Sequence, residues 1–182
     1  MDLASALALR VPGLRVSASP PDLSAAARDL WPRALVDIQG GELPANRPAA
    51  VVWPERAEQV SQLVELGRTQ GFRVVPFGAG SGVCAGVLPH DKIIVMDLKK
   101  MSRWRSLDTH ARTLDVEAGQ MGLPLEEDLN RRGLTAGHFP SSILCSTVGG
   151  WVAARSAGQC SGMYGKIEDM VLALECVTGR GE

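Results

Sequence analysis

The chain has 182 residues, of which 45% are hydrophobic and 21% are charged, and its formal net charge is −1. This apolar content can build a packed core and excludes an intrinsically disordered chain. The balanced charge argues against nucleic acid or an anionic membrane surface as a partner, and no apolar stretch reaches the about 20 residues of a transmembrane helix.

Residues 1–46 are predicted to form a lead-in segment before the main domain. Leu3–Leu9 is expected to be a short helix rich in Ala and Leu. Ser24–Leu35 is expected to be a second helix, with Ser24 as its N-cap and with Pro32 bending or ending it. Nothing in this segment suggests chemistry.

The next part of the chain is predicted to alternate strands with one helix. Glu55–Gln70 has apolar residues at helical spacing, and Gly71 suits its C-terminal cap. Apolar or alternating runs predict strands at Ala49–Trp53, Phe72–Phe77, Ile93–Leu98, Arg103–Leu107 and Thr113–Ala118. The pattern predicts an α+β fold with mixed strand pairing.

A second unit is predicted after Gly119, which gives subdomains of about 47–119 and 120–182. Its expected elements are a helix at Leu123–Arg132, a glycine-bearing helix at Thr147–Ala157 and a strand at Met170–Val177. The last strand is apolar at every position except Glu175, so we expect it to be buried on both faces. Because the chain ends just after it, the C-terminal part of the domain is expected to be missing.

A glycine-rich loop, Pro76–Gly86, is the densest signal in the sequence. Gly80-x-Gly82-x-x-Ala85 fits the dinucleotide fingerprint that follows a strand, with Asp97 near the place of the ribose-binding acid. That fingerprint needs a helix before the next strand, and the glycines and proline of residues 78–92 will not form one. We therefore reject a Rossmann fold.

The same glycines predict an anion site of another kind. Successive backbone N–H groups can converge into a nest that binds a pyrophosphate, and Ser81 adds a hydroxyl donor. The plainer alternative is a loop that only turns tightly.

A second cluster combines small hydroxyl side chains with a pair of glycines. Ser141, Ser142, Ser146 and Thr147 precede a helix whose first turn contains Gly149 and Gly150. Free N–H groups at this helix N-terminus suit an anion or a flavin carbonyl. Close packing of the helix on a strand explains the glycines equally well, and the sequence leaves both alternatives open.

Several of these stretches, in this order, resemble one family. Residues from about Asn46 to Gly181 are similar to the PCMH-type FAD-binding domain of the vanillyl-alcohol-oxidase flavoprotein superfamily. The matching stretches are the loop Pro76–Gly82, the segment Asp108–Gly119 and Ser146-Thr147-Val148-Gly149-Gly150-Trp151. His138-x-Pro140-x-Ser142 and Tyr164-Gly165-x-Ile167-Glu168-Asp169 most resemble alkylglycerone-phosphate synthases, with FAD-linked 2-hydroxyacid oxidases close behind.

The resemblance implies which residues contact FAD. Three stretches match the family's contacts: Pro76, Phe77, Gly78, Ala79, Gly80, Ser81 and Gly82 at the pyrophosphate; Ser141, Ser142, Ile143, Leu144, Cys145, Ser146 and Thr147 along the ribityl chain and flavin; and Ala154, Arg155, Ser156 and Ala157. Ala79 replaces the usual glycine, which requires a negative φ there.

The resemblance also implies an enzyme: a FAD-dependent synthase that exchanges an acyl group for a fatty alcohol, or an oxidase of 2-hydroxy acids. A cap domain absent from this chain would hold the substrate and most catalytic side chains, so this chain alone is expected to be inactive and to self-associate. A third alternative is a non-catalytic flavin-binding module.

The four cysteines, Cys84, Cys145, Cys160 and Cys176, form no C-x-x-C pair, so no metal site is expected. Free thiols and an acidic N-terminus favour the cytoplasm. Cys145 matches a covalent flavin attachment point in some superfamily members, but Ser81 stands where those members have a second linking residue, a histidine. We therefore expect FAD to be held non-covalently.

Overall fold

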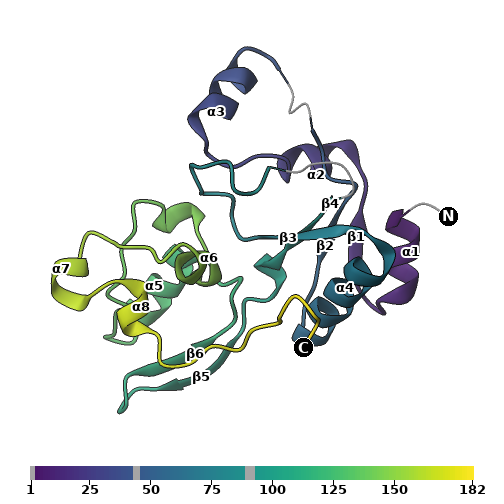
Figure 1. Ribbon diagram of the computed structural model, residues 1–182. Coiled ribbons are helices and arrows are strands. Elements are labelled where there is room, and N and C mark those ends of the chain that lie inside the picture. The colour runs from purple at the N-terminus through teal and green to yellow at the C-terminus, as the bar shows by residue number, and fades with distance from the viewer. Residues whose placement is uncertain (1–2, 43–45, 89–92) are drawn as a thin grey trace. The chain divides into compact units, whose positions relative to one another are not determined.

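The computed structural model describes residues 3–42, 46–88 and 93–182 (Figure 1). Two units have dense internal contacts: Met1–Lys100 together with Cys176–Glu182, and Met101–Glu175. The hairpin that the sequence analysis grouped with the first subdomain, before Gly119, thus lies in the second unit. Each unit is described by itself.

The first unit is built on a four-stranded mixed sheet. Its strands are β1 (Arg15–Ser17), β2 (Ala50–Trp53), β4 (Ile93–Asp97) and β3 (Arg73–Phe77), in that order across the sheet. β1 is antiparallel to β2, whereas β2 and β3 both run parallel to β4. The carboxyl ends of β3 and β4 therefore lie at the same edge, where their following loops meet.

The described part of the β3–β4 connection, residues 78–88, contains no helix. This confirms the argument against a Rossmann fold, although residues 89–92 lie outside the described chain. The helix of the β2–β3 crossover, α4 (Ala57–Gln70), buries Val60 and Leu63 and ends at Gly71, whose φ is 77°. Only glycine adopts this left-handed conformation without strain.

The N-terminal segment differs from its prediction. It forms α1 (Leu3–Arg10), β1, α2 (Pro20–Ala25) and α3 (Pro32–Gln39). The single helix expected at Ser24–Leu35 is wrong, because α2 ends at Ala25 and Pro32 occupies the first turn of α3, where its missing N–H costs nothing. The segment is also part of the core, since Leu23 and Ala26 pack with Val51 and Val95.

The second unit contains a β-hairpin and short helices. The elements are β5 (Trp104–Asp108), β6 (Thr113–Val116), α5 (Gly122–Asn130), α6 (Val148–Ala153), α7 (Ser161–Tyr164) and α8 (Ile167–Met170), and 3-10 turns lie at Ile143–Cys145 here and at Leu98–Lys100 in the first unit. A core of Leu125, Leu129, Trp151 and Ile167 joins α5, α6 and α8. The α+β class predicted from the sequence is confirmed.

Two predictions for this unit are wrong. Met170–Val177 is not a strand: α8 ends at Met170, the following residues have no regular structure, and Leu172 and Leu174 are 82% and 61% exposed. An apolar run becomes a buried strand only where a neighbouring strand pairs with it, and no described strand does so. The helix predicted at Thr147–Ala157 ends at Ala153, because Arg155 adopts a left-handed φ of 49°.

Candidate functional site

The loop after β3 offers several backbone donors that the protein does not use. The N–H groups of Ala79, Gly80, Ser81 and Gly82 have no hydrogen-bond acceptor among the described residues. Gly78 to Ser81 are half-buried. Gly82 is exposed, and the N–H groups of all four residues remain available to water or a ligand, so the loop suits an anionic ligand.

A lysine from the neighbouring strand end holds this loop. Lys99 Nζ donates a hydrogen bond of 2.8 Å to the carbonyl oxygen of Gly78 and one of 2.7 Å to Asp97 Oδ2. The same ammonium group lies 5.0 Å from the centre of the Phe77 ring. Trp53 Nε1 donates to Asp97 Oδ2 at 3.0 Å, so the carboxylate is fixed from two sides.

Lys99 was not predicted from the sequence as a site residue. The available signal was its place two residues after the buried strand β4, at the edge where parallel strands end and ligand-binding loops gather. Asp97, considered there as a ribose-binding acid, instead binds Lys99 and Trp53.

Gly80 is the position in the loop that requires glycine. Its φ is 70°, and a Cβ at this position would lie 2.7 Å from Phe77 Cζ. Ala79 has no positive φ, so the methyl group that departs from the family pattern is accommodated without backbone strain.

The second stretch, Ser141–Thr147, is held by side-chain hydrogen bonds. Trp151 Nε1 donates to Ser146 Oγ at 2.7 Å, and Ser146 Oγ donates to the carbonyl oxygen of Ser142 at 2.7 Å. Thr147 is the N-cap of α6, where its hydroxyl accepts from the N–H of Gly150. Ser146 and Thr147 are both buried, so their hydroxyls maintain the backbone of this stretch.

The N-terminus of α6 is not a free donor site. The N–H groups of Val148 and Gly149 donate to the carbonyl oxygens of Gln120 and Ala118, at 2.9 and 2.8 Å. A Cβ on Gly149 would lie 2.7 Å from Ala118 Cβ. Of the two alternatives that the sequence left open, close packing accounts for Gly149.

His138 is a buried imidazole that contacts the third stretch and α6. His138 is 1% exposed, and its Nε2 lies 2.7 Å from Ser156 Oγ. Its ring contacts Trp151 edge to face at 4.9 Å between centroids. Nδ1 is buried and has no partner among the described residues, and burial lowers the pKa of His138. Burial thus favours the neutral imidazole, with one ring nitrogen left without a hydrogen-bond partner among the described residues.

The third stretch, Ala154–Ala157, was expected to lie on the helix that contains the glycine pair. In the structure it lies just beyond the end of α6. Arg155 forms an ion pair of 2.8 Å with Glu168, which Lys166 also contacts at 2.9 Å. These two cations lower the pKa of Glu168 to about 2. Arg155 is therefore engaged by a carboxylate, while its side chain remains 77% exposed.

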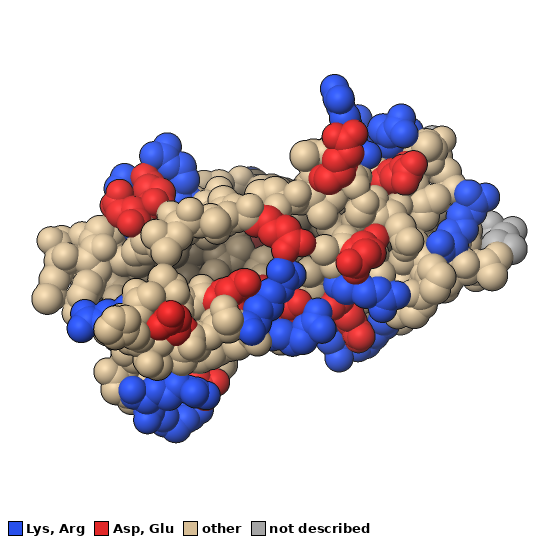
Figure 2. Space-filling view, turned by 90° about the horizontal axis from the view of Figure 1, so that it is seen from below, with Lys and Arg blue, Asp and Glu red and all other residues tan. Residues whose placement is uncertain are grey.

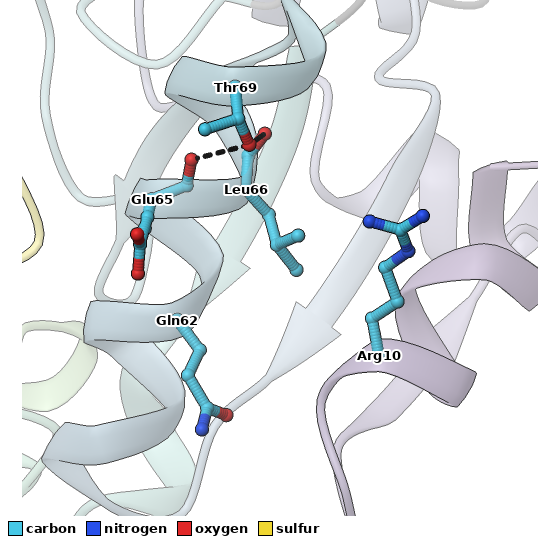
Figure 3. Close-up of a pocket in the computed structure, with 5 residues that line it drawn as sticks. All are labelled: Arg10, Gln62, Glu65, Leu66 and Thr69. Atoms are coloured by element: carbon cyan, nitrogen blue, oxygen red, sulfur yellow. Dashed lines mark hydrogen bonds between the residues drawn. The ribbon is translucent and has the colours of Figure 1, made fainter.

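Other surface features of the described chain lie outside these stretches. A shallow pocket of about 400 Å³ between α1 and α4 is lined by Arg10, Gln62, Glu65, Leu66 and Thr69 (Figure 3). The Thr69 hydroxyl donates back to the carbonyl oxygens of Glu65 and Leu66, so its proton is already used within the helix. None of the predicted site residues lines this pocket.

In the described part of the chain, charged and metal-binding groups indicate no further site. Figure 2 shows acidic and basic side chains interspersed on the face it presents. No three His, Cys, Asp or Glu residues of the described chain gather as a metal site. None of the described helices combines the length and apolarity that crossing a bilayer requires.

Comparison with known proteins gives the class of this chain. The sequence pattern of the family described as "FAD binding domain" matches residues 48–182. The chain is 37% identical over 161 residues to the alkyldihydroxyacetonephosphate synthase of Trypanosoma brucei brucei, covering 85% of this chain and 25% of the relative. It is 29% identical over 137 residues to glycolate oxidase subunit GlcD of Bacillus subtilis (strain 168), covering 75% of this chain and 29% of the relative.

A solved alkyldihydroxyacetonephosphate synthase structure matches with a TM-score of 0.80 at 29% identity, covering 86% of this chain and 29% of that chain. The chain therefore belongs to the FAD-binding domain family, and FAD is its cofactor. The family resemblance found in the sequence is confirmed. The chain spans about a quarter of the length of the synthases that it matches.

Several described features fit FAD. The unused N–H groups of residues 79–82 suit its pyrophosphate, and the unsatisfied Nδ1 of His138 suits a polar atom of the cofactor. The loop belongs to the first unit and His138 to the second, so the fit of each to FAD is judged separately.

Proposed function

We propose that this chain is the FAD-binding portion of an enzyme of the alkyldihydroxyacetonephosphate synthase type. Such an enzyme would catalyse an alkyl/acyl exchange of the ether-lipid type on the flavin. FAD binding is supported by the N–H groups of Ala79–Gly82, which donate to no described residue. The type of enzyme is supported by the 37% identity to the synthase of Trypanosoma brucei brucei. In this proposal Pro76–Gly82 binds the pyrophosphate, Ser141–Thr147 follows the ribityl chain and flavin, and Ala154–Ala157 provides a third contact.

Bound FAD supplies the reactive flavin, and the chain binds and orients it. Lys99 holds the loop through Gly78, and its ammonium group also donates to Asp97. His138 remains neutral and offers Nδ1 to the cofactor or its substrate. Substrate-binding and catalytic side chains are proposed to lie in sequence beyond these 182 residues, and this chain alone is proposed to be inactive.

The test compares two reactions in the complete protein. Exchange of the acyl group of acyl-dihydroxyacetone phosphate for a fatty alcohol supports the synthase. Reduction of a dye by glycolate or D-lactate supports the second candidate, a 2-hydroxyacid oxidase, which the similarity to GlcD favours. Flavin binding without either reaction supports a non-catalytic module.

Non-covalent attachment of FAD is also part of the proposal. The proposal is supported by Ser81, which occupies the place of the linking histidine of bicovalent relatives, while Cys145 matches their other linking residue. Acid precipitation of the holoprotein should leave the yellow flavin in the supernatant. Flavin that remains in the pellet would overturn this part and would implicate Cys145.

Two further parts concern location and association. A cytoplasmic location is supported by the four free cysteines, which a reducing compartment maintains. Self-association is supported by the exposed Leu172 and Leu174. Sedimentation of the chain with both leucines replaced by serine should show less association than the parent chain.

A further inference from the structure

A segment of the N-terminal region lies directly against the glycine loop. The N–H of Leu30 donates a hydrogen bond of 2.8 Å to the carbonyl oxygen of Gly82. A Cβ on Gly82 would lie 3.4 Å from Asp29 Oδ2, and one on Gly80 would lie 3.5 Å from the carbonyl oxygen of Arg28. Residues 28–30 therefore lie beside the last residues of the loop.

Asp29 fixes the conformation of this segment. It is 2% exposed, and its Oδ1 accepts a hydrogen bond of 2.9 Å from the N–H of Trp31. A carboxylate that accepts from the backbone two residues later forms an Asx turn, which sets the direction of the peptide between them. That peptide contains the N–H of Leu30.

We propose that Asp29 is a positioning residue for the FAD pyrophosphate, acting through Leu30 and Gly82. The inference rests on the proposed placement of the pyrophosphate at Pro76–Gly82. The loop is held at both ends through carbonyl groups, by Lys99 at Gly78 and by Leu30 at Gly82. Because only carbonyls are used, the N–H groups between them stay available and are ordered before the ligand binds.

The test measures two flavin affinities in purified apoprotein, because riboflavin lacks the pyrophosphate. Asp29→Ala should raise the dissociation constant for FAD by about tenfold or more, with that for riboflavin unchanged. Asp29→Asn keeps an acceptor for Trp31 and should bind FAD within about threefold of the parent protein. Asp37→Ala is the matched control, since among the described residues the Asp37 carboxylate pairs with the exposed Arg33 of its own helix.

Asp29→Glu covers the case in which the alanine variant does not fold. It keeps the charge but displaces the acceptor by one methylene, and it should weaken FAD selectively as well. Equal weakening of FAD and riboflavin, or unchanged FAD affinity, would overturn the inference. If Ser81→Asp weakens FAD while the Asp29 variants do not, only the role of Asp29 is wrong. If Ser81→Asp has no effect either, the placement of the pyrophosphate is wrong as well.

Discussion

Lys99 Nζ lies 2.7 Å from Asp97 Oδ2, and the same ammonium group donates to the carbonyl oxygen of Gly78, the first residue after β3. Asp97 ends β4, so this pair connects the ends of two parallel strands. The hydrogen bond from Lys99 therefore fixes Gly78, the first residue of a glycine-rich loop that has little intrinsic order.

Lys99→Met should therefore weaken FAD binding. The substitution keeps the length of the side chain but leaves the Gly78 carbonyl free and Asp97 without its cation. We expect about a tenfold loss of FAD affinity and a loss of about 1–3 kcal/mol in the free energy of unfolding. Titration of flavin fluorescence and urea unfolding measure the two effects. Lys100→Met is the control, since Lys100 is exposed and has no described partner, and an equal effect there would refute the role of Lys99.

Gly149→Ala should destabilise the second unit. The added methyl would lie 2.7 Å from Ala118 Cβ and 2.9 Å from the Ala118 carbonyl oxygen, so α6 must move away from that segment. Overpacking of this kind costs about 1–3 kcal/mol. Gly162→Ala, in α7 with open space around it, should be neutral or slightly stabilising. Thermal unfolding of both variants gives the comparison, and a neutral Gly149→Ala would contradict the packing account.

Arg155 provides a test of backbone strain at the end of α6. Its φ of 49° is unfavourable for a residue with a side chain. Arg155→Gly and Arg155→Ala both remove the ion pair with Glu168, so they differ mainly in backbone strain. The glycine variant should be more stable than the alanine variant by about 1 kcal/mol, by urea unfolding. Equal stabilities would show that the left-handed conformation is not maintained in solution.

His138 should make stability fall in mild acid. Its burial lowers its pKa, so the unfolded chain takes up this proton before the folded chain does. The free energy of unfolding should decline as the pH falls below about 6.5, the ordinary histidine value, toward the lowered pKa, by at most about 1.4 kcal/mol per pH unit from this group. His138→Gln should reduce this slope, whereas His110→Gln, at an exposed turn, should not. An unchanged slope in His138→Gln would exclude a buried neutral imidazole.

The sequence predicted the elements whose signal is local. Strands β2 to β6 and helix α4 have short apolar runs or clear helical periodicity, with Gly71 ending α4, and the structure has them within a few residues. The family resemblance could also be found from the sequence, because it depends on short contiguous stretches rich in glycine and in hydroxyl side chains.

The rest depended on contacts between distant residues. β1 has only three residues and exists because Arg15 to Ser17 pair with β2. The run Met170–Val177 looks like a buried strand by composition, yet strand formation needs a partner that no described strand provides. In the site, Lys99 and Leu30 each donate to a carbonyl group of the loop. The place of Lys99 just after β4 marks it as a candidate, but the contacts themselves join residues that are far apart in the sequence.

The most direct test of the central claim is the FAD affinity of Ser81→Asp compared with Ser81→Asn. The two side chains have nearly the same shape, so the comparison isolates a negative charge beside the unused N–H groups. A substitution at Gly80 would not do so, because its positive φ and the nearby Phe77 ring add strain. If the loop binds the pyrophosphate, Ser81→Asp should bind FAD at least about tenfold more weakly than Ser81→Asn, with equal thermal stability of the two apoproteins. Equal FAD affinities in the two variants would contradict the account.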